Sequence, residues 1–230
     1  LSPSIKGLQG MLDICSIYGQ MHDMKFNPTK SVLLCIGCKK QNLPCLYIDK
    51  YPLQWTDKVK YLGVSFVAKF NLQVDSLCIK KKFYAALNSI LCKCKGLIEP
   101  VKLQLIYSYC LPILVYCIGA IEISNNVLNE LSVCWNNVFR NIFHFHKWES
   151  VKELQFGCGH LDFKHMYDIY RYKFITNVST KLPYLCDFFT ILELEHNVLA
   201  KLQCKYRSTA SVGRFVNAVY EHFGDIVRHV

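Results

Sequence analysis

Short apolar runs separated by turn residues dominate the first part of the chain. Apolar side chains recur at helical spacing over residues 5–19, after Ser2 and Pro3, which suit the start of a helix. The pattern then predicts three strands, at about 31–37, at 46–48 and at 59–67. Gly63 would lie in the middle of the last strand, where a glycine weakens pairing and often marks the close approach of another backbone or a ligand.

From residue 74 onward the apolar positions follow a helical period instead. Helices are predicted at 75–95, 101–121, 126–143, 150–156, 162–178 and 189–203. The clearest stripe lies on the helix at 126–143 and consists of Leu128, Leu131, Trp135, Val138, Phe139 and Ile142. The sequence therefore predicts an α+β fold. One helix and about three strands occupy residues 1–73, and all-helical regions follow over 74–147 and 148–230, the last without an assigned role.

One segment allows a different interpretation. Residues 105–121 form a run of 17 residues without a charge, which is near the lower limit for a membrane span. A buried core helix is the favoured interpretation, because the amphipathic helices on either side need an apolar partner. A helical protein anchored in a membrane through 105–121 stays open as an alternative.

Net charge and cysteine content indicate which partners and which redox compartment suit the chain. The net charge is +10, and residues 1–75 and 76–122 each carry +4, whereas residues 183–230 are neutral. A basic surface attracts polyanions such as nucleic acid or an acidic membrane, although charge alone suits an ordinary basic protein equally well. The 13 cysteines form no regular framework, and no signal peptide is visible at the start. We therefore expect reduced thiols and an intracellular protein.

No motif in the sequence predicts a metal centre or a familiar active site. One candidate zinc group consists of Cys35, Cys38 and Cys45 and lacks a clear fourth ligand. Another consists of His144, His146, Cys158 and His160, whose spacing matches no common zinc pattern. Phosphate-binding glycine loops, nucleophile elbows and paired carboxylates for two-metal catalysis are also absent from the sequence.

Three segments stand out by their order along the chain. "FNPTKS" at 26–31 places a turn at Asn27 and Pro28 directly before an apolar run, with Lys30 at the mouth of the expected strand. "VKYLGVSF" follows at 59–66, and a basic helix begins near residue 75. Each segment alone is a weak signal, whereas their order and spacing are more specific.

This order resembles the end of the reverse transcriptase domain of LINE-type, non-LTR retrotransposons, especially the jockey-like group. "LSPSIKGLQGMLDIC" resembles the helix that follows the catalytic Tyr-Ala-Asp-Asp turn of that family. Two short motifs match residue by residue: Asn27, Lys30 and Ser31 in an Asn-x-x-Lys-(Ser/Thr) segment, and Tyr61, Leu62 and Gly63 in a Tyr-Leu-Gly strand. "YSYCLPILVY" and "WNNVFRNIF" are similar to segments after the polymerase core, so the resemblance covers roughly residues 1–180.

The resemblance implies a role for each matching residue. Lys30, positioned by the turn at Asn27 and Pro28, would be a general acid for the pyrophosphate leaving group. A primer grip that holds the primer 3′ end would consist of Tyr61, Leu62 and Gly63, with Lys60 as a neighbouring nucleic-acid contact. A thumb helix would contact duplex phosphates through Lys80, Lys81 and Lys82. A solvated strand end at Lys30, an ordinary strand kink at Gly63 and a solvated helix face at 80–82 remain the alternatives.

The resemblance also implies what this sequence lacks. The carboxylates that bind Mg²⁺ in the family would precede Leu1, so Mg²⁺ is implied for the complete enzyme and no metal or cofactor for this chain. We therefore expect a fragment of an RNA-directed DNA polymerase, its palm ending near residue 73 and its thumb following, without polymerase activity of its own.

The expected partners follow from the same resemblance. They are an RNA template, a DNA primer and the N-terminal part of the polymerase, in the cytoplasm and nucleus, without a membrane. The alternative within this class is a non-catalytic nucleic-acid-binding protein derived from such an element.

Overall fold

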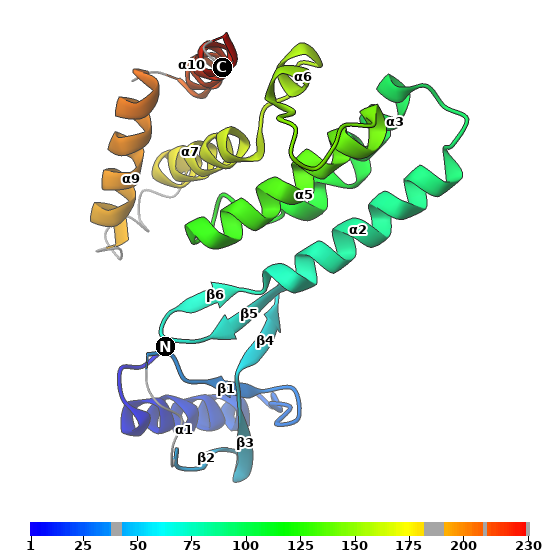
Figure 1. Cartoon of the computed structure of the whole chain (residues 1–230). Coiled ribbons are helices and arrows are strands. Elements are labelled where there is room, and N and C mark those ends of the chain that lie inside the picture. The colour runs from blue at the N-terminus through cyan, green and yellow to red at the C-terminus, as the bar shows by residue number, and fades with distance from the viewer. Residues whose placement is uncertain (38–42, 182–190, 209–210, 229–230) are drawn as a thin grey trace. The chain divides into compact units, whose positions relative to one another are not determined.

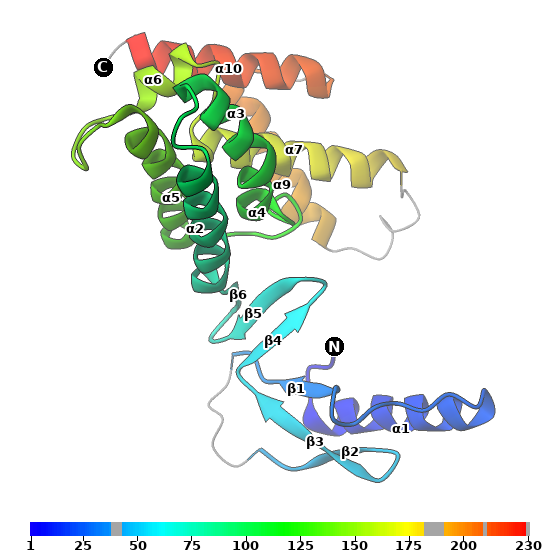
Figure 2. The same cartoon turned by 90° about the vertical axis from the view of Figure 1, so that its right-hand side faces the viewer.

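The computed structural model describes residues 1–37, 43–181, 191–208 and 211–228 (Figure 1). The chain divides into two compact units, Leu1–Asp75 and Ser76–Val230. The described residues of the first unit hold one helix and two small sheets, and those of the second form helices joined by loops, without a strand (Figure 2). The predicted α+β class is confirmed.

The first unit begins with helix α1 (Ile5–Met21). Ser4 is its N-cap, because the Ser4 hydroxyl accepts a hydrogen bond from the backbone N–H of Gly7 at 3.1 Å. Ser2 instead hydrogen-bonds with the backbone of Ser4, so the helix starts two residues later than the Ser2-Pro3 pair predicted.

Helix α1 packs on a three-stranded sheet of order β1-β3-β2. The strands are β1 (Val32–Leu34), β2 (Leu46–Ile48) and β3 (Tyr51–Thr56), with β1 parallel and β2 antiparallel to β3. Their small core consists of Leu33, Leu46, Ile48 and Leu53, covered by Leu8 and Leu12 of the helix. The sequence pattern did not predict β3, because Pro52 at its second position argues against a strand.

The second sheet of this unit is an antiparallel meander of β4 (Lys58–Tyr61), β5 (Val64–Ala68) and β6 (Leu72–Val74). The prediction of one strand over 59–67 is wrong, because the chain reverses between Tyr61 and Val64, which pair with each other. Leu62 and Gly63 both have positive φ, 46° and 83°, as a two-residue type I′ hairpin turn requires. Gly63 is therefore a turn residue, and the described residues of the unit form six strands instead of about three.

The described residues of the second unit form eight helices. They are α2 (Ser76–Lys93), α3 (Glu99–Tyr109), α4 (Leu111–Val115), α5 (Asn125–Phe143), α6 (Lys152–Gly157), α7 (Phe163–Lys181), α9 (Ile191–Tyr206) and α10 (Val212–Arg228). Helix α2 packs against α3, α4 and α5, and α10 packs against α6, α7 and α9 (Figures 1 and 2). Helix α10 was not predicted, although Phe215, Val219 and Phe223 form its buried stripe.

The predicted continuous helix over 101–121 is wrong. Helix α3 ends at Tyr109, and the short α4 begins at Leu111. Pro112 has no N–H to donate, and its ring would collide with the carbonyl of Ser108 in an unbroken helix. Among the residues that the structure describes, no helix is long and apolar enough to cross a membrane.

One core extends through the whole helical unit. Trp135 of α5 is fully buried, and its indole Nε1–H donates a hydrogen bond to the carbonyl of Leu161 at 3.1 Å. Phe215 of α10 stacks on Tyr172 of α7 with ring centroids 3.7 Å apart. The expected division between 74–147 and 148–230 does not correspond to two cores, because side chains from both ranges pack together.

Candidate nucleic-acid interface

The segment before β1 folds into a turn organised by Asn27. Its side-chain oxygen accepts hydrogen bonds from the N–H and the hydroxyl of Thr29, at 3.0 and 2.6 Å. Its backbone carbonyl accepts from the N–H groups of Lys30 and Ser31, at 3.2 and 3.1 Å. The side chain of Asn27 thus accepts a hydrogen bond from a backbone N–H of the turn, which is the usual role of asparagine in a turn.

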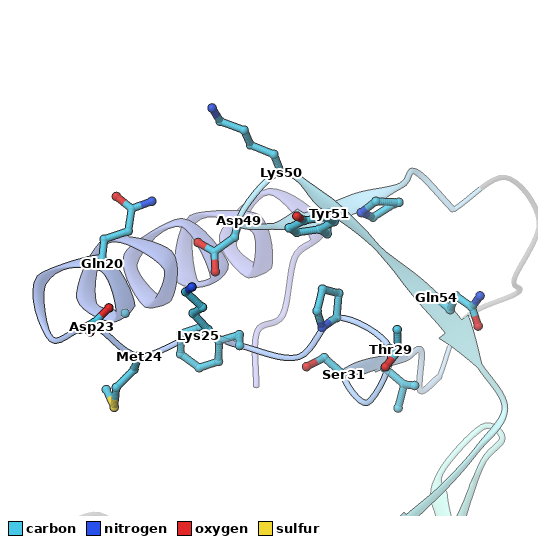
Figure 3. A pocket seen from close by; sticks show the side chains of 15 residues that line it. Gln20, Asp23, Met24, Lys25, Thr29, Ser31, Asp49, Lys50, Tyr51 and Gln54 are labelled. Carbon is cyan, nitrogen blue, oxygen red and sulfur yellow. The ribbon is translucent and has the colours of Figure 1, made fainter.

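This turn borders a pocket of about 1070 Å³ within the first unit (Figure 3). Pro28, Thr29 and Ser31 line the pocket, whereas Lys30 is exposed and is not among the lining residues. The predicted turn at Asn27 and Pro28 is present, but the lysines that line the pocket beside it are Lys25 and Lys50.

The pocket is not predominantly cationic. Asp23 and Asp49 line it together with Lys25 and Lys50, so the two charges of each sign balance. Figure 3 shows Asp49 directed toward the 24–31 segment and Lys50 directed away from it. One carboxylate oxygen of Asp49, Oδ1, is buried without a hydrogen-bond partner in the described structure. This mixture of charges does not form a phosphate cradle around Lys30.

The β4–β5 hairpin carries the predicted primer grip, Tyr61, Leu62 and Gly63, and the preceding Lys60. Tyr61 and Leu62 are 65% and 72% exposed, although both are apolar or aromatic. Strand alternation places Lys58 and Lys60 on the same face, opposite to Tyr61. Lys58 pairs with Asp75 at 3.3 Å, whereas Lys60 is exposed and forms no ion pair with any described residue. The tip therefore exposes two large apolar side chains, with the cation of Lys60 on the opposite face of β4 from Tyr61.

The three lysines at the start of α2 do not form one stripe. Lys80 donates to the carboxylate of Glu130 at 2.8 Å, and Ser76 donates to the same oxygen at 2.7 Å. The hydrogen bond from Lys80, followed by that from Ser76, lowers the pKa of Glu130. Lys81 and Lys82 are exposed and point in different directions, because successive helical residues turn by about 100°. Only these two lysines of the set are available to an external anion.

Neither candidate zinc group forms a metal site in the described part of the chain, where no three potential ligands come together. Burial lowers the pKa of His160, which lies against aromatic rings, while His146 stacks on Trp148. Cys38 lies outside the described residues. Ten described cysteines are free thiols, whereas Cys35 is disulfide-bonded, so the prediction of reduced thiols is wrong at that position.

One further group of side chains was not predicted as a site from the sequence. Residues 144–148 follow α5 and were considered only as metal ligands, yet an aromatic pair and cations border a second pocket there, of about 440 Å³. Alternation of aromatic and basic residues in "FHFHKW" was the signal that could have drawn attention to it.

Comparison with known proteins finds no match for this chain. The chain matches no protein-family model, no curated protein and no solved structure. The surface geometry and the order of the sequence motifs are therefore the grounds for a functional proposal.

Proposed function

We propose that this chain is part of an RNA-directed DNA polymerase of the non-LTR retrotransposon type and contacts its template–primer through the β4–β5 hairpin. The observation that carries the proposal is the exposed tip formed by Lys60, Tyr61, Leu62 and Gly63. Two large apolar side chains that are exposed next to each other, as Tyr61 and Leu62 are, are suited to contact with a partner.

The chemistry of the tip suits a nucleic-acid end. An exposed aromatic ring can stack on a base or a sugar without reading sequence, and Lys60, on the other face of the same strand, can neutralise a phosphate. The glycine turn brings the backbone itself to the surface, since Gly63 has no side chain. Lys81 and Lys82 would add phosphate contacts from α2, which agrees with the basic character of residues 1–122.

An apolar surface on α1 favours the interpretation of the chain as part of a larger enzyme. The alternative is a nucleic-acid-binding protein that functions without further polypeptide. Met11, Ile14, Tyr18 and Met21 are 47%, 67%, 52% and 75% exposed, at spacings of three and four residues along one side of the helix. Such a surface is typical of contact with further protein. In this proposal the remaining part of the polymerase covers it and supplies the carboxylates that bind Mg²⁺.

The binding test uses a labelled RNA–DNA hybrid and fluorescence anisotropy at several salt concentrations. The double variant Lys60→Gln/Tyr61→Ala should weaken binding about 10-fold or more, because a stacking contact alone contributes about 1–3 kcal/mol. Its salt dependence should fall by about one unit for the lost phosphate contact. The matched control is Lys50→Gln/Tyr51→Ala, which removes the same two residue types from the exposed β2–β3 turn.

Equal weakening in the two double variants would show that charge alone drives binding and would contradict a specific hairpin contact. A separate assay with primer, template, nucleotides and Mg²⁺ should give no extension by the purified chain. Extension would show that the chain holds a complete active site, contrary to the proposal.

A further inference from the structure

The loop after α5 presents a flat aromatic surface. The rings of His146 and Trp148 are stacked, with centroids 4.6 Å apart and planes only 3° from parallel. Trp148 is 81% exposed, so one face of the indole is supported by histidine while much of the residue remains open. Tryptophan at a protein surface usually covers apolar neighbours, and an indole held flat and open is suited to stacking with another planar group.

Two cations lie in the same pocket as this pair. Arg140 and Lys147 line the cavity of about 440 Å³ together with His146 and Trp148. A volume of this size is within the range of small-ligand pockets and accommodates a group as large as one nucleotide. The pocket therefore combines a planar apolar surface with positive charge at its border.

The guanidinium of Arg140 is held in place by neutral partners. Its Nη1 donates to the side-chain oxygen of Asn137 at 3.1 Å, and its Nη2 donates to the backbone carbonyl of Glu149 at 3.0 Å. Asn137 in turn donates to the hydroxyl of Tyr84 at 3.1 Å. Because these partners carry no charge, they orient the guanidinium without cancelling its positive field.

The charges around the pocket leave a net cation. Neither Arg140 nor Lys147 is in an ion pair within the described residues. Arg140 Nε is buried and has no hydrogen-bond partner there. The acid of the loop is Glu149, whose carboxylate accepts from the backbone N–H of His146 and so fixes the loop. Two cations, of which Arg140 is held in place, against one carboxylate favour an anionic ligand.

We propose that this pocket binds an unpaired nucleotide of a single-stranded nucleic acid. The base stacks on the open face of Trp148, and the neighbouring phosphates are contacted by Lys147 and attracted by Arg140. Aromatic stacking combined with a basic groove is the usual means of binding single strands without sequence preference. A paired base is already stacked on both sides within a duplex, so the site selects unpaired nucleotides.

This inference does not rest on the hairpin contact proposed above. It concerns another surface, built entirely from the helical unit, and another form of nucleic acid. The two proposals therefore fail separately: the Lys60/Tyr61 variant tests hybrid binding, and the variants below test single-strand binding.

The test measures binding of a labelled 12-nucleotide deoxyadenylate strand by anisotropy. Trp148→Ala should weaken binding about 5- to 150-fold, the range expected for one lost stacking contact, and Trp148→Phe should retain most of the affinity. The matched control is Tyr109→Ala, which removes another exposed aromatic side chain of the same unit, 69% exposed, and should have little effect.

Two further arms separate stacking from charge. On an abasic strand of the same length the effect of Trp148→Ala should disappear, because no base is left to stack. Lys147→Gln should weaken binding to both strands by more than Lys93→Gln, its control on an exposed part of α2. Far-ultraviolet circular dichroism and thermal unfolding of each variant should match the parent chain, since Trp148 is exposed.

Several outcomes would overturn the proposal. They are equal losses for Trp148→Ala and Tyr109→Ala, a Trp148→Ala loss that persists on the abasic strand, or adenosine monophosphate that binds as tightly as the 12-nucleotide strand. The last result would assign the pocket to a free nucleotide instead.

Discussion

The two units of this chain are stabilised in different ways. The core of the first unit is small, with Leu33 and Leu53 among its few fully enclosed side chains. Hydrogen bonds from polar side chains of α1 connect the helix to the β2 strand and the turn after it. The Gln9 amide both accepts from and donates to the backbone of Tyr47, at 2.9 and 3.0 Å, and Ser16 accepts from the N–H of Asp49 at 3.0 Å.

The second unit relies instead on a large apolar core. Phe83, Trp135 and Phe215 come from three different helices and are all fully buried. Burial of apolar surface is the main favourable contribution to folding, whereas a hydrogen bond to an exposed edge contributes only about 1 kcal/mol net. The first unit, which carries Lys30 and the predicted primer grip, therefore has less of its own core to stabilise its fold than the helical unit.

Expressing each unit by itself tests this difference in stability most directly. Residues 76–230 expressed alone should unfold cooperatively in urea, because their core is complete without residues 1–75. Residues 1–75 expressed alone should be marginal, since a small domain with few enclosed side chains barely offsets its chain entropy. Circular dichroism during urea titration measures both, and a sharp transition of equal stability for residues 1–75 would contradict the comparison.

Acid should destabilise the helical unit in two stages. Burial lowers the pKa of His160, and burial with the charges of His165 and Lys205 lowers that of His222. The unfolded histidines, with pKa about 6.5, then take up protons first, so stability falls as the pH drops below about 6.5. Burial raises the pKa of Asp162, but the hydrogen bond and charge of His165 outweigh it and lower the pKa overall. Stability is therefore lost further below about pH 4.

The urea midpoint of residues 76–230 at pH 8, 5.5 and 3.5 measures these stages. The variant His222→Gln removes one of the groups and should flatten the first stage while leaving the second. A midpoint that stays constant or rises from pH 8 to pH 5.5 would contradict the assignment.

The smallest expected effect compares two glycines of the first unit. Gly63→Ala should destabilise the hairpin by about 1–2 kcal/mol, because its φ of 83° is strained for any residue with a Cβ. Gly10→Ala should instead stabilise α1 by about 1 kcal/mol, since a Cβ there meets nothing within 4 Å and alanine favours a helix. Amide hydrogen exchange in the full chain follows both elements, and equal signs for the two substitutions would contradict the turn geometry.

Sequence periodicity located the helices well where one face is buried. The structure has α5 over Asn125–Phe143, against 126–143 predicted, because Leu131, Trp135 and Val138 stand on a single buried stripe. The stripe of α10 was equally readable from Phe215 and Val219 and was overlooked.

The prediction failed at the β4–β5 hairpin because apolar residues continue on both sides of its turn. Tyr61 and Leu62 precede Gly63 and Val64 follows it, so the hairpin was predicted as one strand. Pro112 marked the break after α3, but the run of uncharged residues around it outweighed that signal.

The candidate site was only partly predictable for a related reason. The turn at Asn27 follows from local chemistry, whereas the presence of Lys50 in the same pocket depends on a hairpin about 20 residues away. The exposure of Trp148 likewise depends on how the loop leaves α5, fixed by contacts such as that of Arg140 with the Glu149 carbonyl. Contacts between segments distant in sequence leave no trace in periodicity or spacing.

The hydrogen bond from Trp135 to Leu161 limits how the chain can be shortened. A premature stop between residues 147 and 161 would leave the indole N–H without its acceptor. A stop before α10 would remove Phe215 from the ring of Tyr172 and open the core from the other end. Mutation that truncates the gene would therefore abolish the helical unit as a whole, so the described helices from α2 to α10 should be inherited or lost together.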